Sequence, residues 1–379
     1  MTAAAMHIAL IASPERWRSE RELVRRLAIG LLGEGATVTV IEPVPERDPE
    51  SVLPELVRSE RRFEVPRRLS YEVRVPFWRR EERLHRMVSA FERSMPDLLW
   101  AVGADGWELA TQFADACDRP VALELRRDVD LKFAPRALRS DRVVALVTPC
   151  EALARVARSI VSEQFVRVVP IGVRVDESLP PRIGPARIIA IIGEGRDERP
   201  FAAALRAAHA ALERFPELLF LVEFPLGTGS SLWRFARALG ILNRVTAVDA
   251  AAVGGRLAMT AVSACDVLMS IEPHGGPRPE VLTALGRAVP VIAAADPMCD
   301  ALVDGETALL LPAGEMQSAV WTEALLATLD HPDQSREMAA RGRALVVARY
   351  RSSVAASACL ATALDLVRGG PLRFVPPQP

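Results

Sequence analysis

The sequence predicts an α/β protein in which two doubly wound, Rossmann-like domains face a central cleft. Three observations indicate this fold class. Short apolar segments alternate with amphipathic helical segments through both halves of the chain, which is typical of parallel sheets. The 379 residues are too many for one ordinary core and suit two domains of medium size. A proline-rich stretch with Pro180, Pro181 and Pro185 lies near the middle and predicts a linker.

In the first half, we expect a strand at residues 6–11, a turn at 13–18 and an amphipathic helix at 21–32. Further strands are expected at 37–41, 98–102, 121–125, 143–147 and 166–169, with helices at 107–116 and 151–162. An arginine-dense stretch from Arg58 to Arg86 carries interleaved aromatic residues. It predicts either a solvated face whose charge is offset by glutamates, or a patch that contacts an acceptor or a membrane surface.

In the second half, the same alternation predicts a second parallel sheet. Strands are expected at residues 187–192, 218–223, 244–248, 267–271 and 290–294. Helices are expected at 202–215, 232–239, 280–286, 318–329, 333–347 and 354–367. Pro279 suits the first position of the helix at 280–286, and Gly286 suits its end.

The composition is that of a globular protein without a strong charge bias. Half of the residues are hydrophobic and the formal net charge is −1, so no global field favours nucleic acid. The five cysteines are scattered and lack a CxxC pair, which indicates buried thiols in a reducing compartment. Neither a signal peptide nor an uncharged apolar run of about 18 residues is evident. We therefore expect a cytoplasmic protein.

The loop between the strand at 267–271 and the helix at 280–286 is the main functional candidate. Glu272 follows the strand, Glu280 lies in the first helical turn, and Gly275 and Gly276 lie between them. Such a loop lies at the carboxyl edge of a parallel sheet, where ligands bind. The glycines let backbone approach an anion, and the helix N-terminus offers unpaired N–H groups. Glu280 can accept hydrogen bonds from vicinal hydroxyls; the alternative is two acids in a solvated surface loop.

Glu272 and Glu280, with Ala-Leu-Gly at 284–286 and Val-Pro-Val-Ile at 289–292, resemble the acid pair of retaining glycosyltransferases of GT-B fold, family 4. Similar landmarks occur in order at 96–99, 147–152, 168–173, 239–245 and 304–310. The resemblance implies transfer of a sugar from a nucleotide-diphosphate sugar to an acceptor hydroxyl, with retained configuration. It implies an acceptor-side domain at 1–180, a nucleotide-sugar domain at 181–352, a terminal helix at 353–370 that packs back on the first domain, and a tail at 371–379.

The resemblance also implies roles for single residues of the crevice. Glu272 and Arg199 are assigned to catalysis, with Arg199 stabilising the charge of the leaving diphosphate. Donor binding is assigned to Glu280, Gly275, Gly276, His274, Arg196 and Gly193. The nucleotide sugar is a substrate, so neither a cofactor nor a metal is expected, and no nucleic acid is expected. The base and sugar of the donor, the acceptor (a glycan, a lipid-linked molecule or a small molecule) and the oligomeric state are not readable.

Three features depart from the family pattern. Glu194 stands where relatives carry an arginine that clamps the diphosphate; one unit charge pair at about 4 Å is worth about 4 kcal/mol at an effective dielectric near 20. Arg126 follows a strand where relatives place a sugar-contacting histidine. Glycine turns are missing after the first strand and before Asp300. These departures support an alternative function, a catalytically degenerate GT-B protein that scaffolds an active glycosyltransferase or binds a nucleotide sugar for it.

Overall fold

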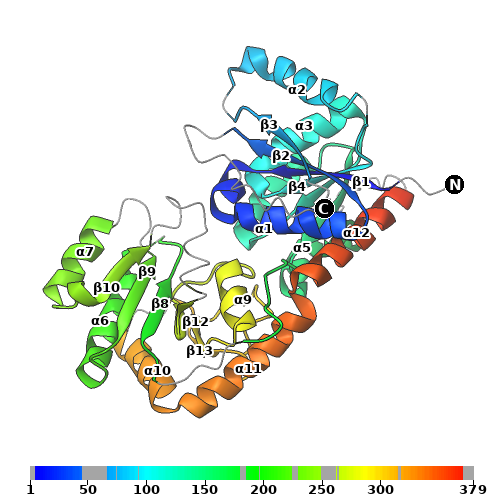
Figure 1. Cartoon of the computed structure of the whole chain (residues 1–379). Coiled ribbons are helices and arrows are strands. Elements are labelled where there is room, and N and C mark those ends of the chain that lie inside the picture. Colours follow the sequence, from blue (N-terminus) through cyan, green and yellow to red (C-terminus); the bar gives the residue numbers. More distant parts are fainter. Residues whose placement is uncertain are drawn as a thin grey trace, which may run out of the picture.

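The computed structural model describes residues 5–44, 66–73, 75–92, 94–179, 185–195, 197–223, 229–248, 262, 264–314 and 317–369. These residues form two lobes, each built on one parallel sheet (Figure 1). Helices cover both faces of each sheet, as expected for strands that read as continuous apolar runs. The predicted fold class, two doubly wound Rossmann-like domains, is confirmed.

The first sheet has seven strands in the order β3-β2-β1-β4-β5-β6-β7, and every pair is parallel. The order reverses at β1, so β1 and β4 lie at the centre, where a ligand crevice is expected beyond the carboxyl ends. The strands are β1 (His7–Ala12), β2 (Thr37–Pro43), β3 (Arg67–Tyr71), β4 (Leu98–Val102), β5 (Val121–Glu124), β6 (Val143–Thr148) and β7 (Val166–Val168).

Two sets of helices sandwich the first sheet. Helix α1 (Pro14–Gly33) packs on one face together with α12 (Ser352–Arg368), the last helix of the chain. The opposite face carries α2 (Arg80–Ser89), α3 (Trp107–Cys117) and α5 (Glu151–Arg158), with the short α4 (Ala134–Ala137) beside them. The final helix therefore completes the core of the first lobe.

The second sheet has six strands in the order β10-β9-β8-β11-β12-β13, again all parallel. They are β8 (Ile188–Ile192), β9 (Leu219–Glu223), β10 (Val245–Val248), β11 (Val267–Ser270), β12 (Val291–Ala294) and β13 (Leu309–Leu311). The helices of this lobe are α6 (Glu198–Arg214), α7 (Gly229–Ala238), α9 (Pro279–Gly286), α10 (Ser318–Asp330) and α11 (Pro332–Arg349). Central β8 and β11 mark the switch point of this sheet, and α9 follows β11 as predicted.

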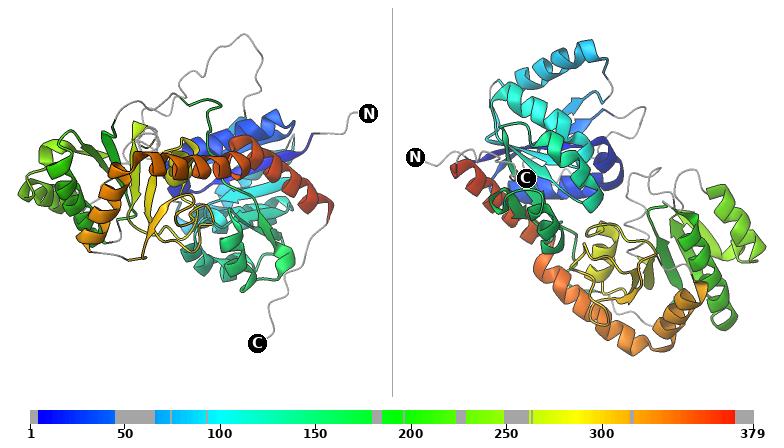
Figure 2. Two further views of the ribbon diagram at one scale, coloured as in Figure 1. Left: turned by 90° about the horizontal axis from the view of Figure 1, so that it is seen from below. Right: turned by 180° about the vertical axis from the view of Figure 1, so that it is seen from behind.

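The chain crosses between the lobes twice, at adjacent points. The first crossing follows β7, and the second joins α11 to α12, which extend from the second lobe to the first (Figure 2). The crossings are hydrogen-bonded to each other: Val173 N–H donates to Tyr350 O (2.8 Å), and Ser352 N–H donates to Val173 O (3.0 Å). The two lobes are thus joined by one paired crossing.

The expected turn at residues 13–18 is wrong. Helix α1 begins at Pro14, and Ser13 is its N-cap, with Oγ accepting from Arg16 N–H (3.2 Å). Serine before proline is a strong helix-start signal, which the expectation overlooked. The backbone is non-helical at Glu20, and this kink explains why the amphipathic pattern in the sequence begins only at residue 21.

The arginine-dense stretch contains an edge strand and a helix that were not expected, β3 and α2. Arg58, Arg61, Arg62 and Arg74 lie outside the described residues. Among the described ones, Arg68 Nε donates to Glu42 (3.2 Å) and Arg79 Nε donates to Glu82 (3.1 Å). These pairs offset part of the positive charge of the stretch, whereas contact with a membrane through it stays a prediction.

Candidate functional site

Glu272 and Glu280 both lie at the carboxyl edge of the second sheet. Glu272 comes two residues after β11, and its side chain is buried. Its Oε2 accepts a hydrogen bond from Gly195 N–H at 2.7 Å, which ties the loop after β8 to the loop after β11. Gly193 lies in the same loop, where a Cβ would come within 2.9 Å of both Glu272 Oε2 and the Phe201 ring. A glycine is required there by this close approach.

Glu280, in the first turn of α9, is held by an arginine that the sequence analysis missed. Arg278 Nε donates to Glu280 Oε2 (3.2 Å), and Arg278 Nη2 donates to Glu223 Oε2 (2.6 Å) at the end of β9. Arg278 is buried, which by itself would lower the pKa of its guanidinium, but the two carboxylates outweigh burial and raise it. Burial raises the pKa of Glu223 despite this contact. Arg278 therefore fixes the orientation of Glu280.

The glycine loop between the two acids is bound from within the chain. Asp296, just beyond β12, accepts hydrogen bonds at Oδ2 from the N–H groups of His274 (3.0 Å), Gly275 (2.9 Å) and Gly276 (3.3 Å). Three convergent amides make an anion-binding concavity, and here its occupant is a carboxylate of the same chain. Binding of the donor by Gly275 and Gly276 stays a prediction.

The other side of the glycine loop packs against the first lobe. Gly275 O accepts from Asp128 N–H (2.9 Å), and Gly275 has a φ of +83°, which favours glycine. A Cβ at Gly275 would overlap the Asp128 carboxylate, and a Cβ at Gly276 would overlap Arg126 O. The glycines thus allow the backbones of the two lobes to touch at the crevice.

Glu194, which departs from the family pattern, is charge-compensated by residues of both lobes. Its Oε1 lies 2.5 Å from His274 Nδ1, and its Oε2 lies 3.6 Å from Arg127 Nη1 of the first lobe. Burial would raise the pKa of Glu194, but the hydrogen bond to His274 and the charges of His274, Arg278 and Arg127 outweigh it and lower the pKa to about 2. Glu194 is therefore an ionised carboxylate that links the lobes.

Among the described residues, Arg199 pairs with Asp197 and not with the residues of this cluster. Its side chain is 72% exposed, and its Nε donates to Asp197 (2.6 Å), the N-cap of α6. Arg196 lies outside the described residues. The structure therefore brings together Glu272, His274, Gly275, Gly276 and Glu280, whereas the catalytic role of Arg199 stays a prediction.

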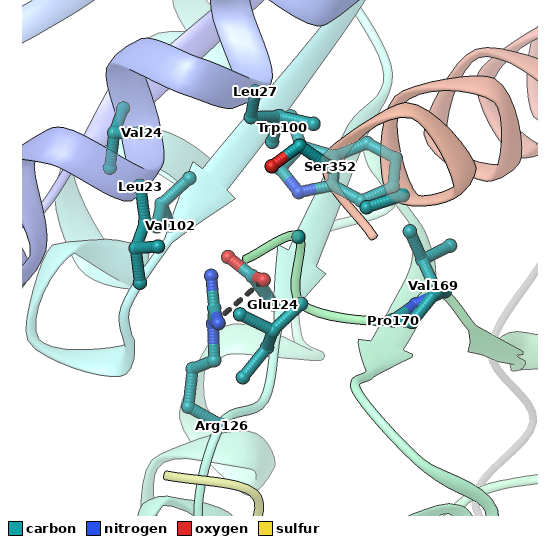
Figure 3. Close-up of a pocket in the computed structure, with 13 residues that line it drawn as sticks. Leu23, Val24, Leu27, Trp100, Val102, Glu124, Arg126, Val169, Pro170 and Ser352 are labelled. Carbon is teal, nitrogen blue, oxygen red and sulfur yellow. Dashed lines mark ion pairs between the residues drawn. The ribbon is translucent and has the colours of Figure 1, made fainter. Parts of the chain in front are cut away.

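On the first lobe, buried charges take the place of the histidine that relatives carry. Arg126 Nε pairs with Glu124 Oε1 at 2.8 Å (Figure 3), and Arg16 pairs with Glu20 on α1. Both Arg126 and Glu124 are buried. Burial raises the pKa of Glu124, and Arg126 offsets this only in part. Among these two arginines and two glutamates, protonation of Glu124 would leave one positive charge in excess.

Glu124 also lines a cavity of about 20 Å³ between α1, α12 and the first crossing (Figure 3). Within the described part of the chain, Glu124 Oε2, Trp100 Nε1 and Ser352 Oγ have no hydrogen-bond partner. The volume suffices for one water molecule. The cavity lies next to the paired crossing and is too small for a substrate.

Arg127, Glu223, Arg278 and Asp296 were not predicted as site residues. Glu223, Glu194 and Asp296 share one signal, a polar residue at or just beyond the carboxyl end of a buried strand. The neighbouring order β9-β8-β11-β12 brings these strand ends together, and that order could have indicated them. No comparable signal identifies Arg278.

No helix among the described residues is long and apolar enough to cross a bilayer. No group of three or more His, Cys, Asp or Glu side chains among them is arranged to hold a metal ion.

The fold is that of known GT-B proteins. A glycosyltransferase from Rickettsia africae superposes with a TM-score of 0.69 at 13% identity, over 97% of this chain and all of that chain. HepE from Anabaena, in complex with UDP and glucose, gives 0.71 at 14% identity, over 95% of this chain and all of that chain. A protein described as a UDP-N-acetylglucosamine 2-epimerase from Listeria monocytogenes gives 0.64 at 13% identity, over 96% of each chain. No family model and no curated protein matches the sequence.

Proposed function

We propose that this chain is a glycosyltransferase that transfers a sugar from a nucleotide-diphosphate sugar to an acceptor hydroxyl, with retention of configuration. One observation carries the proposal. Glu272 and Glu280 lie together at the carboxyl edge of the second sheet, with the first lobe directly across the glycine loop. Support comes from the GT-B fold, which HepE uses to bind UDP and glucose. The acceptor is an unidentified hydroxyl compound, whether glycan, lipid-linked or small molecule.

Glu280 is suited to the ribose of the donor. Among the described residues, Arg278 engages only its Oε2, so Oε1 can accept hydrogen bonds from vicinal hydroxyls. Charge-assisted hydrogen bonds of this kind are stronger than neutral ones. Glu272, two residues beyond β11, then lies on the sugar side of the same loop.

The chemical demand is to stabilise charge on the departing nucleoside diphosphate. Fixed cations and N–H groups in a site closed to water do this best, because they need no reorganisation during the reaction. The glycine loop is in direct contact with residues 126–128 of the first lobe, and we infer that this contact shields one side of the crevice from water. A closed crevice favours transfer to an acceptor over hydrolysis.

Calorimetric titration with UDP-, GDP- and ADP-sugars tests the proposal. We expect the wild type to bind one class, and Glu280→Ala to weaken that binding about 10- to 100-fold, because a charged acceptor of hydrogen bonds is lost. Glu323→Ala, an exposed acid on α10, is the matched control and should bind like the wild type.

The product separates this function from its rivals. Release of nucleoside diphosphate together with a glycosylated acceptor of the donor's anomeric configuration supports the proposal, whereas an inverted product contradicts retention. An epimerised nucleotide sugar would instead indicate the reaction described for the Listeria protein. Failure to bind any nucleotide sugar would favour the degenerate scaffold.

A further inference from the structure

We propose that Arg127, His274 and Arg278 form an anion site across the two lobes, that Glu194 occupies it as an internal placeholder, and that the diphosphate of the nucleotide donor displaces Glu194. The proposal rests on the proposed function, since the anion it names belongs to the donor. Glu194 lies two residues after β8. Arg127, His274 and Arg278 all lie on other elements of the structure.

The contacts of Glu194 are those that a phosphate group would make. One carboxylate oxygen lies 2.5 Å from His274 Nδ1 and the other lies 3.6 Å from Arg127 Nη1, so the anion bridges the lobes. Arg127 also pairs with Glu15 (3.1 Å) and Asp130 (3.4 Å), which hold its guanidinium at this edge of the first lobe. The cation is thus positioned before any ligand arrives.

Both arginines of the site carry a nitrogen that lacks a hydrogen-bond partner among the described residues. Within the described residues, Nη1 of Arg278 and Nε of Arg127 are buried and have no hydrogen-bond partner. A buried N–H of a charged group without a partner is costly. A carboxylate offers two acceptor oxygens and one charge, whereas a diphosphate offers more of both and matches the fork geometry of two guanidiniums.

Glu194 is placed so that it can leave. It lies in the loop between β8 and α6, next to Gly195 with a φ of +68°, and its side chain is 16% exposed. Glu272 holds this loop by the Gly195 amide, so Glu194 can turn toward water while the backbone stays fixed. Glu223 and Glu280 keep Arg278 in place during the exchange.

The exchange also explains why a negative residue is compatible with a donor site. A diphosphate placed beside a retained Glu194 would meet a like charge at contact distance. Once Glu194 turns out, the same diphosphate meets Arg127 and Arg278 from opposite lobes. Donor binding then replaces one bridging anion with another, and the lobes stay joined.

Titration of inorganic pyrophosphate, and of UDP, GDP and ADP, against variants tests the site. We expect Glu194→Gln to bind pyrophosphate and the preferred nucleotide about tenfold more tightly, equivalent to about 1.4 kcal/mol. Arg127→Gln should weaken both about tenfold and cancel the gain in the double variant, whereas Arg127→Lys should restore part of the affinity. Arg136→Gln, which removes an exposed arginine of the same lobe, is the matched control and should change neither. Melting curves verify folding.

The outcomes distinguish the two proposals. Unchanged or weaker pyrophosphate and nucleotide binding by Glu194→Gln overturns the anion site, even if the wild type binds nucleotide sugars. Arg127-dependent pyrophosphate binding without any binding of nucleotide sugars supports the site and overturns the proposed function. Absence of both kinds of binding in every variant overturns both.

Discussion

At the scale of single residues, charge compensation governs the crevice. Glu194, Glu223 and Glu280 would repel one another and any anionic ligand, yet Arg278 and Arg127 bind all three carboxylates. Buried charges are tolerated when they are paired, and removal of one partner is strongly destabilising. The effect of replacing any one of these charged residues on stability therefore depends on the partners that it leaves behind.

Glu124 gives a prediction at this scale. Its pKa is raised by burial, so folding favours the protonated acid. That contribution is complete below the unfolded value near 4.5 and is lost as the pH rises through the folded pKa. Glu124→Gln, which cannot ionise, should therefore gain stability relative to the wild type as the pH rises from 5 to 8.

Denaturant unfolding across that pH range is the measurement. The exposed pair partner Glu108, changed to Gln, provides the control for loss of an acid at the surface. Parallel pH profiles for the wild type and Glu124→Gln would show that Glu124 is ionised in the folded protein.

The loop acids show what sequence could and could not reveal at this scale. Glu272, Glu280 and the glycines between them were predicted to share a crevice because they follow one strand within nine residues. Asp296 and Glu223 lie on other strands, so their contacts with the glycine amides and with Arg278 depend on strand order and side-chain direction. The spacing of residues along the sequence indicates neither the order of the strands nor the direction of the side chains.

At the scale of elements, α1 and α12 depend on a small residue at their contact. A Cβ at Gly30 would lie 2.7 Å from Ala356 Cβ, which is closer than two carbons can pack. Gly33, in the same helix, has nothing within 4 Å of the position of its Cβ. The two glycines therefore allow a matched comparison within one helix.

Gly30→Ala should lower the free energy of unfolding by about 1–2 kcal/mol, because the methyl group forces α12 away from α1. Gly33→Ala gains the same helix propensity without a clash, so this variant should have a free energy of unfolding higher by up to about 1 kcal/mol. Thermal and denaturant unfolding measure both changes. Equal effects in the two variants would show that α12 can move without loss of packing.

Element boundaries were predicted well wherever apolar periodicity was strong. Pro279 and Gly286 delimit α9 as predicted, since proline and glycine restrict the backbone locally. The edge strand β3 escaped prediction because Arg67 and Arg68 break the apolar pattern; its place is set by pairing with β2. The start of α1 was missed because the kink at Glu20 interrupts the periodicity.

At the scale of the whole molecule, the bridge of Glu194 to Arg127 and His274 links folding of the two lobes to pH. The pKa of Glu194 is lowered from 4.5 to about 2, so its contribution is present above the unfolded value and is lost as the pH falls from about 4.5 toward 2. The stability difference between the wild type and Glu194→Gln should be on the order of 2–3 kcal/mol at pH 7 and should shrink across that interval.

Unfolding of both proteins from pH 7 down to pH 3 checks this, with Glu323→Gln as the control for an exposed acid. A difference that stays constant with pH would mean that Glu194 is not stabilised as an anion by the bridge.

The paired crossing has a consequence for how such a chain can be altered. Residues 174–350 leave the first lobe beside Val173 and return to it at Arg351, so the second lobe is inserted into the first at a single paired crossing. A different domain whose two ends are the same distance apart could be inserted at this crossing without disturbing α12. Rotation of one lobe against the other must likewise distort the backbone hydrogen bonds at this crossing. The two chain connections therefore act as one hinge and not as two independent hinges.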